Sequence, residues 1–325
     1  MMKRTSAIAL VLFACGGPTP EPKTTEPPPK PVATATETKP DAAAPDSTKT
    51  SDAGADAAPV VDEKPRVLDA GAEPRAVRTY SFVANKVEKR IVTITQEQQR
   101  AGAGGQSLTL VMHVELTPKK VEPKGTHFDL KVTKLEMPQT GIPAEQRAAI
   151  TKSLGELVGL TGGFDVSPRG EAGEVSMQGD PKMQNPIAES IVQAIAQTSE
   201  MVTPAFPDEP IGVGAKWERE QQLSDSGMKA SNKATYTLKE VNAEGGVVDV
   251  DIEMKMPTRE VPGRNVTLSV DGKGKYTYRF RFDRLATSVK GELTIKQHIE
   301  AVDGSGKKQT IDETQIAKQT IDTPK

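Results

Sequence analysis

The alternation of hydrophobic and polar positions is the strongest structural signal in this sequence. Apolar residues occupy every second position, with polar or charged residues between them, in segments 108–116, 128–132, 248–256, 276–282 and 289–295. A period of two places the apolar side chains on one side of a β-strand. Connections rich in Gly, Pro and Asp separate several of these segments, which is typical of hairpins. The pattern predicts an antiparallel sheet with one apolar face and one charged face.

Two segments have the spacing of amphipathic helices instead. The first is 143–158, and the second begins at Asn185 and Pro186, which provide an N-cap and a proline at the first helical position. One side of the first helix is expected to carry Ile150, Leu154, Leu157 and Val158. Because the apolar face of a sheet needs a cover, the predicted fold is mainly β (α+β). It is a long curved antiparallel sheet, or half-barrel, wrapped over two amphipathic helices.

The N-terminal part of the chain differs from the rest in composition. Positions 1–14 combine basic residues with an apolar run, as in a signal peptide. The run spans about 12 Å as a helix, whereas the hydrocarbon core of a bilayer is about 30 Å thick. Positions 15–76 are rich in Pro, Ala and Thr and lack aromatic residues, so we predict a disordered linker there. Residues 77–325 are then expected to form a single β-rich domain.

The apolar run ends in the sequence Leu12-Phe13-Ala14-Cys15. It resembles the lipobox of bacterial lipoproteins, in which a Leu and a small residue precede the modified Cys. By that resemblance Cys15 is acylated and becomes the new N-terminus. The resemblance further implies a lipid-anchored protein of the cell envelope, held at the outer membrane and facing the periplasm or the cell surface.

A second resemblance lies in segment 206–218, which reads Phe-Pro-Asp-Glu-Pro-Ile-Gly-Val-Gly-Ala-Lys-Trp-Glu. Its aromatic–proline pair, second proline and Val-Gly-x-x-Trp sequence resemble a family of uncharacterised bacterial envelope proteins. In that family such a segment leads from a helix into a C-terminal strand meander. The order of predicted elements is also similar to the half-barrel of periplasmic lipoprotein carriers and lipid-binding lipoproteins. The resemblance implies a fold and no catalytic residue.

Composition and motifs exclude several classes of function. A single Cys among 325 residues excludes a disulfide framework, and a net charge of −2 argues against a nucleic-acid binder. The sequence has no nucleophile elbow and no phosphate-binding loop. We therefore expect no enzyme, no cofactor and no bound metal.

The histidines offer the only alternative to that expectation. His113 and His127 fall on outward positions of neighbouring predicted strands. A turn centred near residue 121 would place His113 opposite Asp129 or Lys131, and His127 opposite Glu115 or Thr117. Such a group could bind a metal, but we interpret it as a solvated polar face.

An aromatic and methionine-rich stripe is the candidate binding surface. It is predicted to line an apolar ligand cavity, with packed core as the alternative, and consists of Met254, Met256, Tyr276, Tyr278, Phe280 and Phe282. Trp217, the only tryptophan, is either a ring at the pocket mouth or a structural plug. The predicted function is a monomeric, non-enzymatic envelope lipoprotein that binds or carries a lipid or other hydrophobic ligand. The alternative is a structural or adhesive surface protein that presents a solid β domain to protein or polysaccharide partners.

Overall fold

The computed structural model describes residues 64–100, 105–138, 144–173, 175–178, 202–225, 228–260, 266–302 and 307–324, together with Val192, Ala194, Ile195 and Thr198. The elements up to the helix are β1 (Arg66–Asp69), β2 (Glu88–Arg100), β3 (Gln106–Glu122), β4 (Gly125–Glu136) and α1 (Ala144–Leu157). A hairpin of β5 (Thr161–Val166) and β6 (Ser176–Gln178) follows. The remaining strands are β7 (Lys216–Asp225), β8 (Met228–Val241), β9 (Gly245–Glu260), β10 (Val266–Arg281), β11 (Arg284–Val302) and β12 (Lys308–Asp322).

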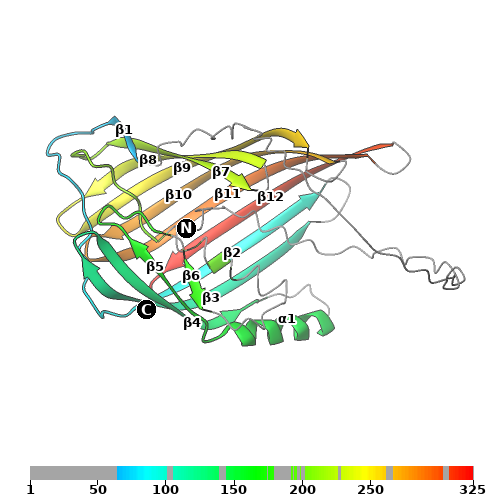
Figure 1. Ribbon diagram of the computed structural model, residues 1–325, viewed down its shortest axis with the longest axis horizontal. Helices are drawn as coiled ribbons and strands as arrows, with labels where there is room; N and C mark the ends of the chain where they lie inside the picture. The colour runs from blue at the N-terminus through cyan, green and yellow to red at the C-terminus, as the bar shows by residue number, and fades with distance from the viewer. Residues whose placement is uncertain are drawn as a thin grey trace, which may run out of the picture. The chain divides into compact units, whose positions relative to one another are not determined.

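All twelve described strands belong to one antiparallel sheet (Figure 1). Their order is β1-β7-β8-β9-β10-β11-β12-β2-β3-β4-β5-β6. The last strand, β12, pairs with β2, so that Ile321 lies opposite Val92 and the two halves of the chain form one sheet. The strands β1 and β6 end the sheet without pairing to each other, which leaves it open. The prediction of a mainly β, antiparallel protein is confirmed.

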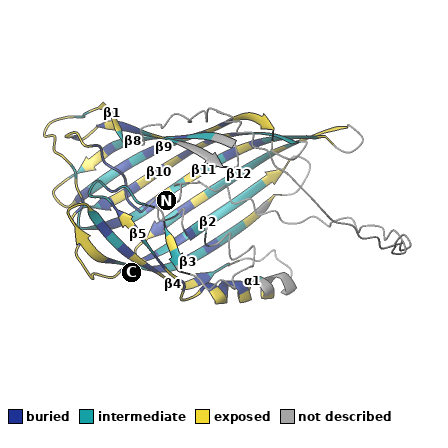
Figure 2. Ribbon diagram, in the orientation of Figure 1, coloured by how far each residue is buried: buried dark blue, intermediate teal, exposed yellow. Residues whose placement is uncertain are grey.

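The apolar side chains gather on one side of the sheet, which we call the inner face; the opposite side is the outer face. Strand β10 shows the alternation most clearly, because Tyr276, Tyr278 and Phe280 are buried and the residues between them are exposed. Figure 2 shows the same alternation as bands of buried and exposed residues along neighbouring strands. The period of two in the sequence therefore identifies which residues face inward.

The connection from β1 to β2, residues 70–87, crosses one end of the sheet. Its backbone amides donate in turn to the carbonyl oxygens of residues in well-separated segments of the chain: Ala76 to Ile211 (3.1 Å), Tyr80 to Pro168 (2.8 Å), Ser81 to Phe282 (2.7 Å) and Asn85 to Pro118 (2.7 Å). We call this the closed end of the sheet. The connection ties the β7 side of the sheet to the β3–β4 hairpin.

Aromatic rings fill the closed end. A continuous series of ring contacts joins Trp217, Tyr236, Phe206, Phe280, Phe282, Tyr80, Phe82, Phe128 and Phe164. Their geometries include both stacked and edge-on pairs, the arrangements that aromatic rings prefer. The series runs from β7 to β5 and therefore holds the two sides of the open sheet together.

The predicted cover of two amphipathic helices is not supported within the described residues. Helix α1 packs against β4, at one side of the sheet, and the second expected helix is described only at Val192, Ala194, Ile195 and Thr198, whose backbone is helical. The connection 70–87 and the buried segment 202–207 cover the closed end instead. The inner face is therefore not wrapped over two amphipathic helices within the described residues.

The apolar stripe expected on the first helix also differs at its end. Leu154 and Leu157 are buried, but Val158 is 46% exposed. The helix ends at Leu157, and Gly159 has a φ of 93°, a left-handed conformation that commonly terminates helices. Val158 therefore lies beyond the helix and does not share its buried side.

The N-terminal predictions concern mostly residues that the structure does not describe. The signal peptide 1–14, Cys15 and the linker as far as residue 63 lie outside the described residues. Arg66–Asp69 fall within the range predicted as linker, yet they pair with β7, so the described sheet begins before residue 77. In the described part of the chain, no helix has the length and hydrophobicity needed to cross a membrane.

Candidate functional site

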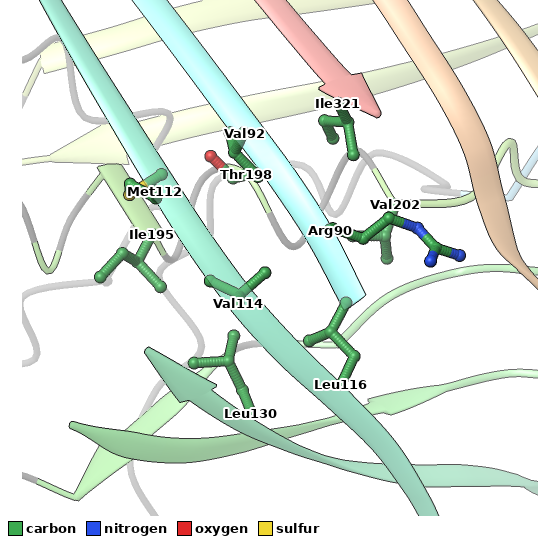
Figure 3. Close-up of a pocket in the computed structure, with 10 residues that line it drawn as sticks. All are labelled: Arg90, Val92, Met112, Val114, Leu116, Leu130, Ile195, Thr198, Val202 and Ile321. Carbon is green, nitrogen blue, oxygen red and sulfur yellow. The ribbon is translucent and has the colours of Figure 1, made fainter. Parts of the chain in front are cut away.

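A small apolar cavity lies on the inner face near the closed end (Figure 3). Its volume is about 20 Å³, which is room for roughly one water molecule. Strands β2, β3, β4 and β12 supply the lining residues Arg90, Val92, Met112, Val114, Leu116, Leu130 and Ile321. The other lining residues, Ile195, Thr198 and Val202, come from the chain between β6 and β7. The cavity thus lies between the sheet and this covering segment.

Arg90 is the one charged residue in the cavity lining. Its side chain is 3% exposed and forms an ion pair with Glu88, whose side chain is 5% exposed. The guanidinium also donates to the carbonyl oxygens of Ala286 (3.0 Å), Leu285 (3.1 Å) and Lys89 (2.9 Å). Burial lowers the pKa of Arg90 and raises the pKa of Glu88, while each partner's charge opposes the shift of the other. The arginine thereby binds the start of β2 to the start of β11.

Sequence reasoning missed this buried ion pair. Glu88 and Arg90 occupy inward positions of β2, as the pairing of Arg90 with Val114 on β3 shows. The alternation along β2 could have revealed it, because Glu88 and Arg90 fall at the same alternate positions as the buried Val92. Two opposite charges on an inward series indicate a buried pair.

The aromatic part of the predicted ligand-lining stripe lies in the main buried cluster. Tyr276, Tyr278 and Phe280 are buried, and Phe282 is partly buried. Desolvation raises the pKa of Tyr276 to about 12. Its ring lies against Gly291, where a Cβ atom would stand only 2.0 Å from Cδ1 of the tyrosine. The missing side chain at position 291 therefore lets the ring lie against β11.

The methionines of the stripe belong to a different buried cluster. Met254 and Met256 pack with Val270 and Ile295, away from the ring series. None of the six predicted lining residues borders the cavity of Figure 3. The six side chains therefore contribute to two separate parts of the inner face.

Trp217 is fully buried at the closed end. Its indole Nε1 donates to the carbonyl oxygen of Ala205 at 2.8 Å. Its ring stacks on Tyr236 with a centroid distance of 5.3 Å and also contacts Phe206. Trp217 does not border the cavity, and its position corresponds to the structural plug.

The expected pairing of the histidines was wrong because the β3–β4 turn lies between Glu122 and Gly125, further along the chain than the predicted centre near residue 121. His113 therefore lies opposite Lys134, and His127 lies opposite Lys120. The register also shifts by one residue after residue 113 and after residue 118, but these two shifts cancel between the histidines. His127 Nδ1 lies 2.9 Å from Asp165 Oδ1. Among the described residues, no three His, Cys, Asp or Glu side chains are grouped so that they could hold a metal ion.

The fold and the cavity define a mainly β protein with a buried inner face. The model of a family of unknown function, DUF6263, matches residues 187–286. That range includes β7, β8, β9 and β10 and ends within β11. No curated protein shows significant similarity to this chain. The matched range also contains segment 206–218, which carried the resemblance to uncharacterised envelope proteins.

Proposed function

We propose that this protein is a non-enzymatic, half-barrel-like binding protein of the cell envelope that holds a hydrophobic ligand against the inner face of its sheet. The cavity beside Val114 is the observation that carries the proposal. Seven of its ten lining residues are Val, Leu or Ile, and it lies between the sheet and a segment that belongs to no described strand. Apolar pockets with few polar groups are the usual form of sites for small hydrophobic molecules.

The size of the cavity determines how a ligand would enter. A volume of about 20 Å³ is far below the roughly 300 Å³ of the smallest typical ligand pockets. An acyl chain would therefore have to displace the side chains of Ile195, Thr198 and Val202 from β2 and β3. These residues bring mainly aliphatic contacts, which an acyl chain would replace with contacts of the same kind.

A cavity-filling substitution tests the proposal. We expect Val114→Phe to weaken laurate binding at least tenfold, because the ring would occupy the space that the acyl chain needs. The measurement is isothermal titration of laurate into the full chain carrying Cys15→Ser. Trp217 fluorescence reports whether each variant is folded.

The matched control is Val111→Phe. Val111 lies on the same strand but alternates with the inward-facing Leu110 and Met112, so its side chain is on the outer face. This variant should bind laurate like the parent chain. Equal laurate binding by the parent chain, Val114→Phe and Val111→Phe would refute a site at the cavity. If none of the three proteins binds laurate, the structural or adhesive alternative is favoured.

The proposal includes an anchor at Cys15, which rests on the lipobox resemblance of Leu12-Phe13-Ala14-Cys15. Several acyl chains on one residue give stable membrane attachment. Cells fed labelled palmitate should label the wild-type chain and not the Cys15→Ser variant. Equal labelling of both would refute acylation at this residue.

A further inference from the structure

The inner face carries amide side chains among its apolar ones at a distance from the closed end. Register across the sheet shows the change, because residues that pair on successive strands form rows. One row contains Asn232, Met254, Gly272, Ile295 and Gln315. The next row outward contains Met256, Val270, Gln297 and Glu313. We call these two rows the amide half, because they contain the amide side chains of Asn232, Gln297 and Gln315 beside apolar side chains.

Two amides of this surface have unpaired polar atoms. Asn232 is 8% exposed and Gln297 is 3% exposed. Within the described part of the chain, Oδ1 of Asn232 and Nε2 of Gln297 are buried without a hydrogen-bond partner. Such groups are rare in native proteins, because desolvating them without a partner costs free energy. A ligand that supplied the missing partners would remove that cost.

The neighbouring amide groups of Gln98 and Gln315 do have a hydrogen-bond partner. Gln315 Nε2 and Gln98 Nε2 both donate to Oε1 of Glu313, at 2.6 and 2.8 Å. The groups that remain are a neutral acceptor on β8 and a neutral donor on β11. A hydroxyl group can donate to the first and accept from the second. The chemistry therefore matches an uncharged ligand that bears several hydroxyl groups.

The spacing of the two amides indicates an extended group. From β8 to β11 there are three strand spacings, about 14 Å, and Gln297 lies one row, or two residues, further along the strands, so that the two amides are about 16 Å apart in a flat sheet. A single hydroxyl group cannot contact both amides, whereas the hydroxyl groups of a disaccharide are spread over much more of that distance. Concave curvature of the sheet would shorten the span between side chains that point inward.

The distance to the cavity also fits an amphiphile. Val289 on β11 lies opposite the cavity residue Ile321, and the strand from Val289 to Gln297 extends about 27 Å at 3.4 Å per residue. One acyl chain spans roughly half of a 30 Å hydrocarbon core, or about 15 Å. The remaining length is available for a sugar head group.

We propose that the amide half binds the uncharged, hydroxyl-rich head group of an amphiphile whose acyl chain enters the cavity, with Asn232 and Gln297 as the head-group contacts. This rests on the proposed function, because it assigns the polar end of the same ligand. The ligand class is a neutral glycolipid, as opposed to a fatty acid or an anionic phospholipid.

The test compares two probes with the same twelve-carbon chain: dodecyl maltoside below its micellar concentration and laurate. Both are titrated into the full chain carrying Cys15→Ser. We expect dodecyl maltoside to bind at least fivefold more tightly than laurate. Gln297→Met and Asn232→Leu should each weaken maltoside binding about five- to tenfold and leave laurate binding within twofold.

A stability measurement separates loss of the site from loss of the fold. Since Gln297→Met removes an unpaired buried amide, it should raise the melting temperature of the free protein while weakening maltoside binding. The matched control is Gln99→Met, at an exposed position of β2 that pairs with Thr314; it should change neither quantity.

The outcomes distinguish the two proposals. If laurate binds and responds to Val114→Phe, but maltoside binds no more tightly or ignores Gln297→Met and Asn232→Leu, the head-group site is refuted and the proposed function stands. If neither probe binds, both proposals fail. A lower melting temperature for Gln297→Met would also contradict an unpaired amide at this position.

Discussion

Replacing Arg90 with methionine is expected to lower the free energy of unfolding by about 3–5 kcal/mol, because the change leaves the buried carboxylate of Glu88 without its counter-charge. The carbonyl oxygens of Ala286 and Leu285 would also lose their donor. Methionine is a suitable replacement, since it keeps most of the apolar volume beside the cavity. Urea denaturation followed by Trp217 fluorescence measures the loss.

Two further variants identify the cause of that loss. The double variant Glu88→Gln/Arg90→Met should lose less than Arg90→Met alone, because no charge stays buried without a partner. Lys89→Met removes the neighbouring cation, whose side chain is 66% exposed and lies 3.3 Å from Glu115, and should cost less than about 1 kcal/mol. A loss for Arg90→Met as small as that for Lys89→Met would contradict the structural role of the buried pair.

The second large effect is expected for Trp217→Ala, which should lower the free energy of unfolding by about 3–5 kcal/mol. The substitution would leave a cavity beside Tyr236 and Phe206 and remove the donor to the carbonyl oxygen of Ala205. Because the only tryptophan is lost, the transition must be followed by circular dichroism.

Two milder substitutions near the closed end serve as controls for the loss of unfolding free energy in Trp217→Ala. Trp217→Phe keeps a ring in the cluster and loses the hydrogen bond, so it should cost less than the alanine variant. Leu68→Ala removes a side chain that is 49% exposed, and it should lie within about 0.5 kcal/mol of the wild type. An equally small loss for Trp217→Ala would show that the ring series does not hold the closed end together.

Much of the sheet was predictable because its strands alternate strictly. In β10, the inward series that contains Tyr276, Tyr278 and Phe280 was visible as a period of two, and the structure buries all three side chains. The hairpins between β9 and β10 and between β10 and β11 were expected from the alternating segments and the connections between them. Local patterns suffice where a strand has one buried face and one solvated face.

The remaining features depend on contacts between distant segments. The bulges after His113 and after Pro118 change which residues face each other on β3 and β4, and no pattern within either strand shows them. The connection 70–87 has no regular alternation, and its backbone bonds to four separate segments of the chain instead of one neighbouring strand. The role of the buried pair of Glu88 and Arg90 depends on the fold, which brings the Arg90 side chain within hydrogen-bonding distance of Leu285 and Ala286 at the start of β11.

The candidate site was only partly visible for the same reason. The sequence showed that the inner face is apolar, and it indicated aromatic and methionine side chains as a ligand lining. The cavity found in the structure is lined instead by residues such as Met112, Val114 and Ile321, from strands that are distant in sequence. The pairing of β12 with β2 brings these residues together, and this closing pair joins the two ends of the domain.

Native mass spectrometry tests most directly whether the inner face holds a hydrophobic ligand. The full chain carrying Cys15→Ser would be purified without detergent and weighed under native and under denaturing conditions. We expect an additional mass in the range of a lipid under native conditions only, present in Val111→Phe and absent in Val114→Phe. Identical native and denatured masses for the parent chain, or an additional mass that survives Val114→Phe, would contradict a ligand held in the cavity.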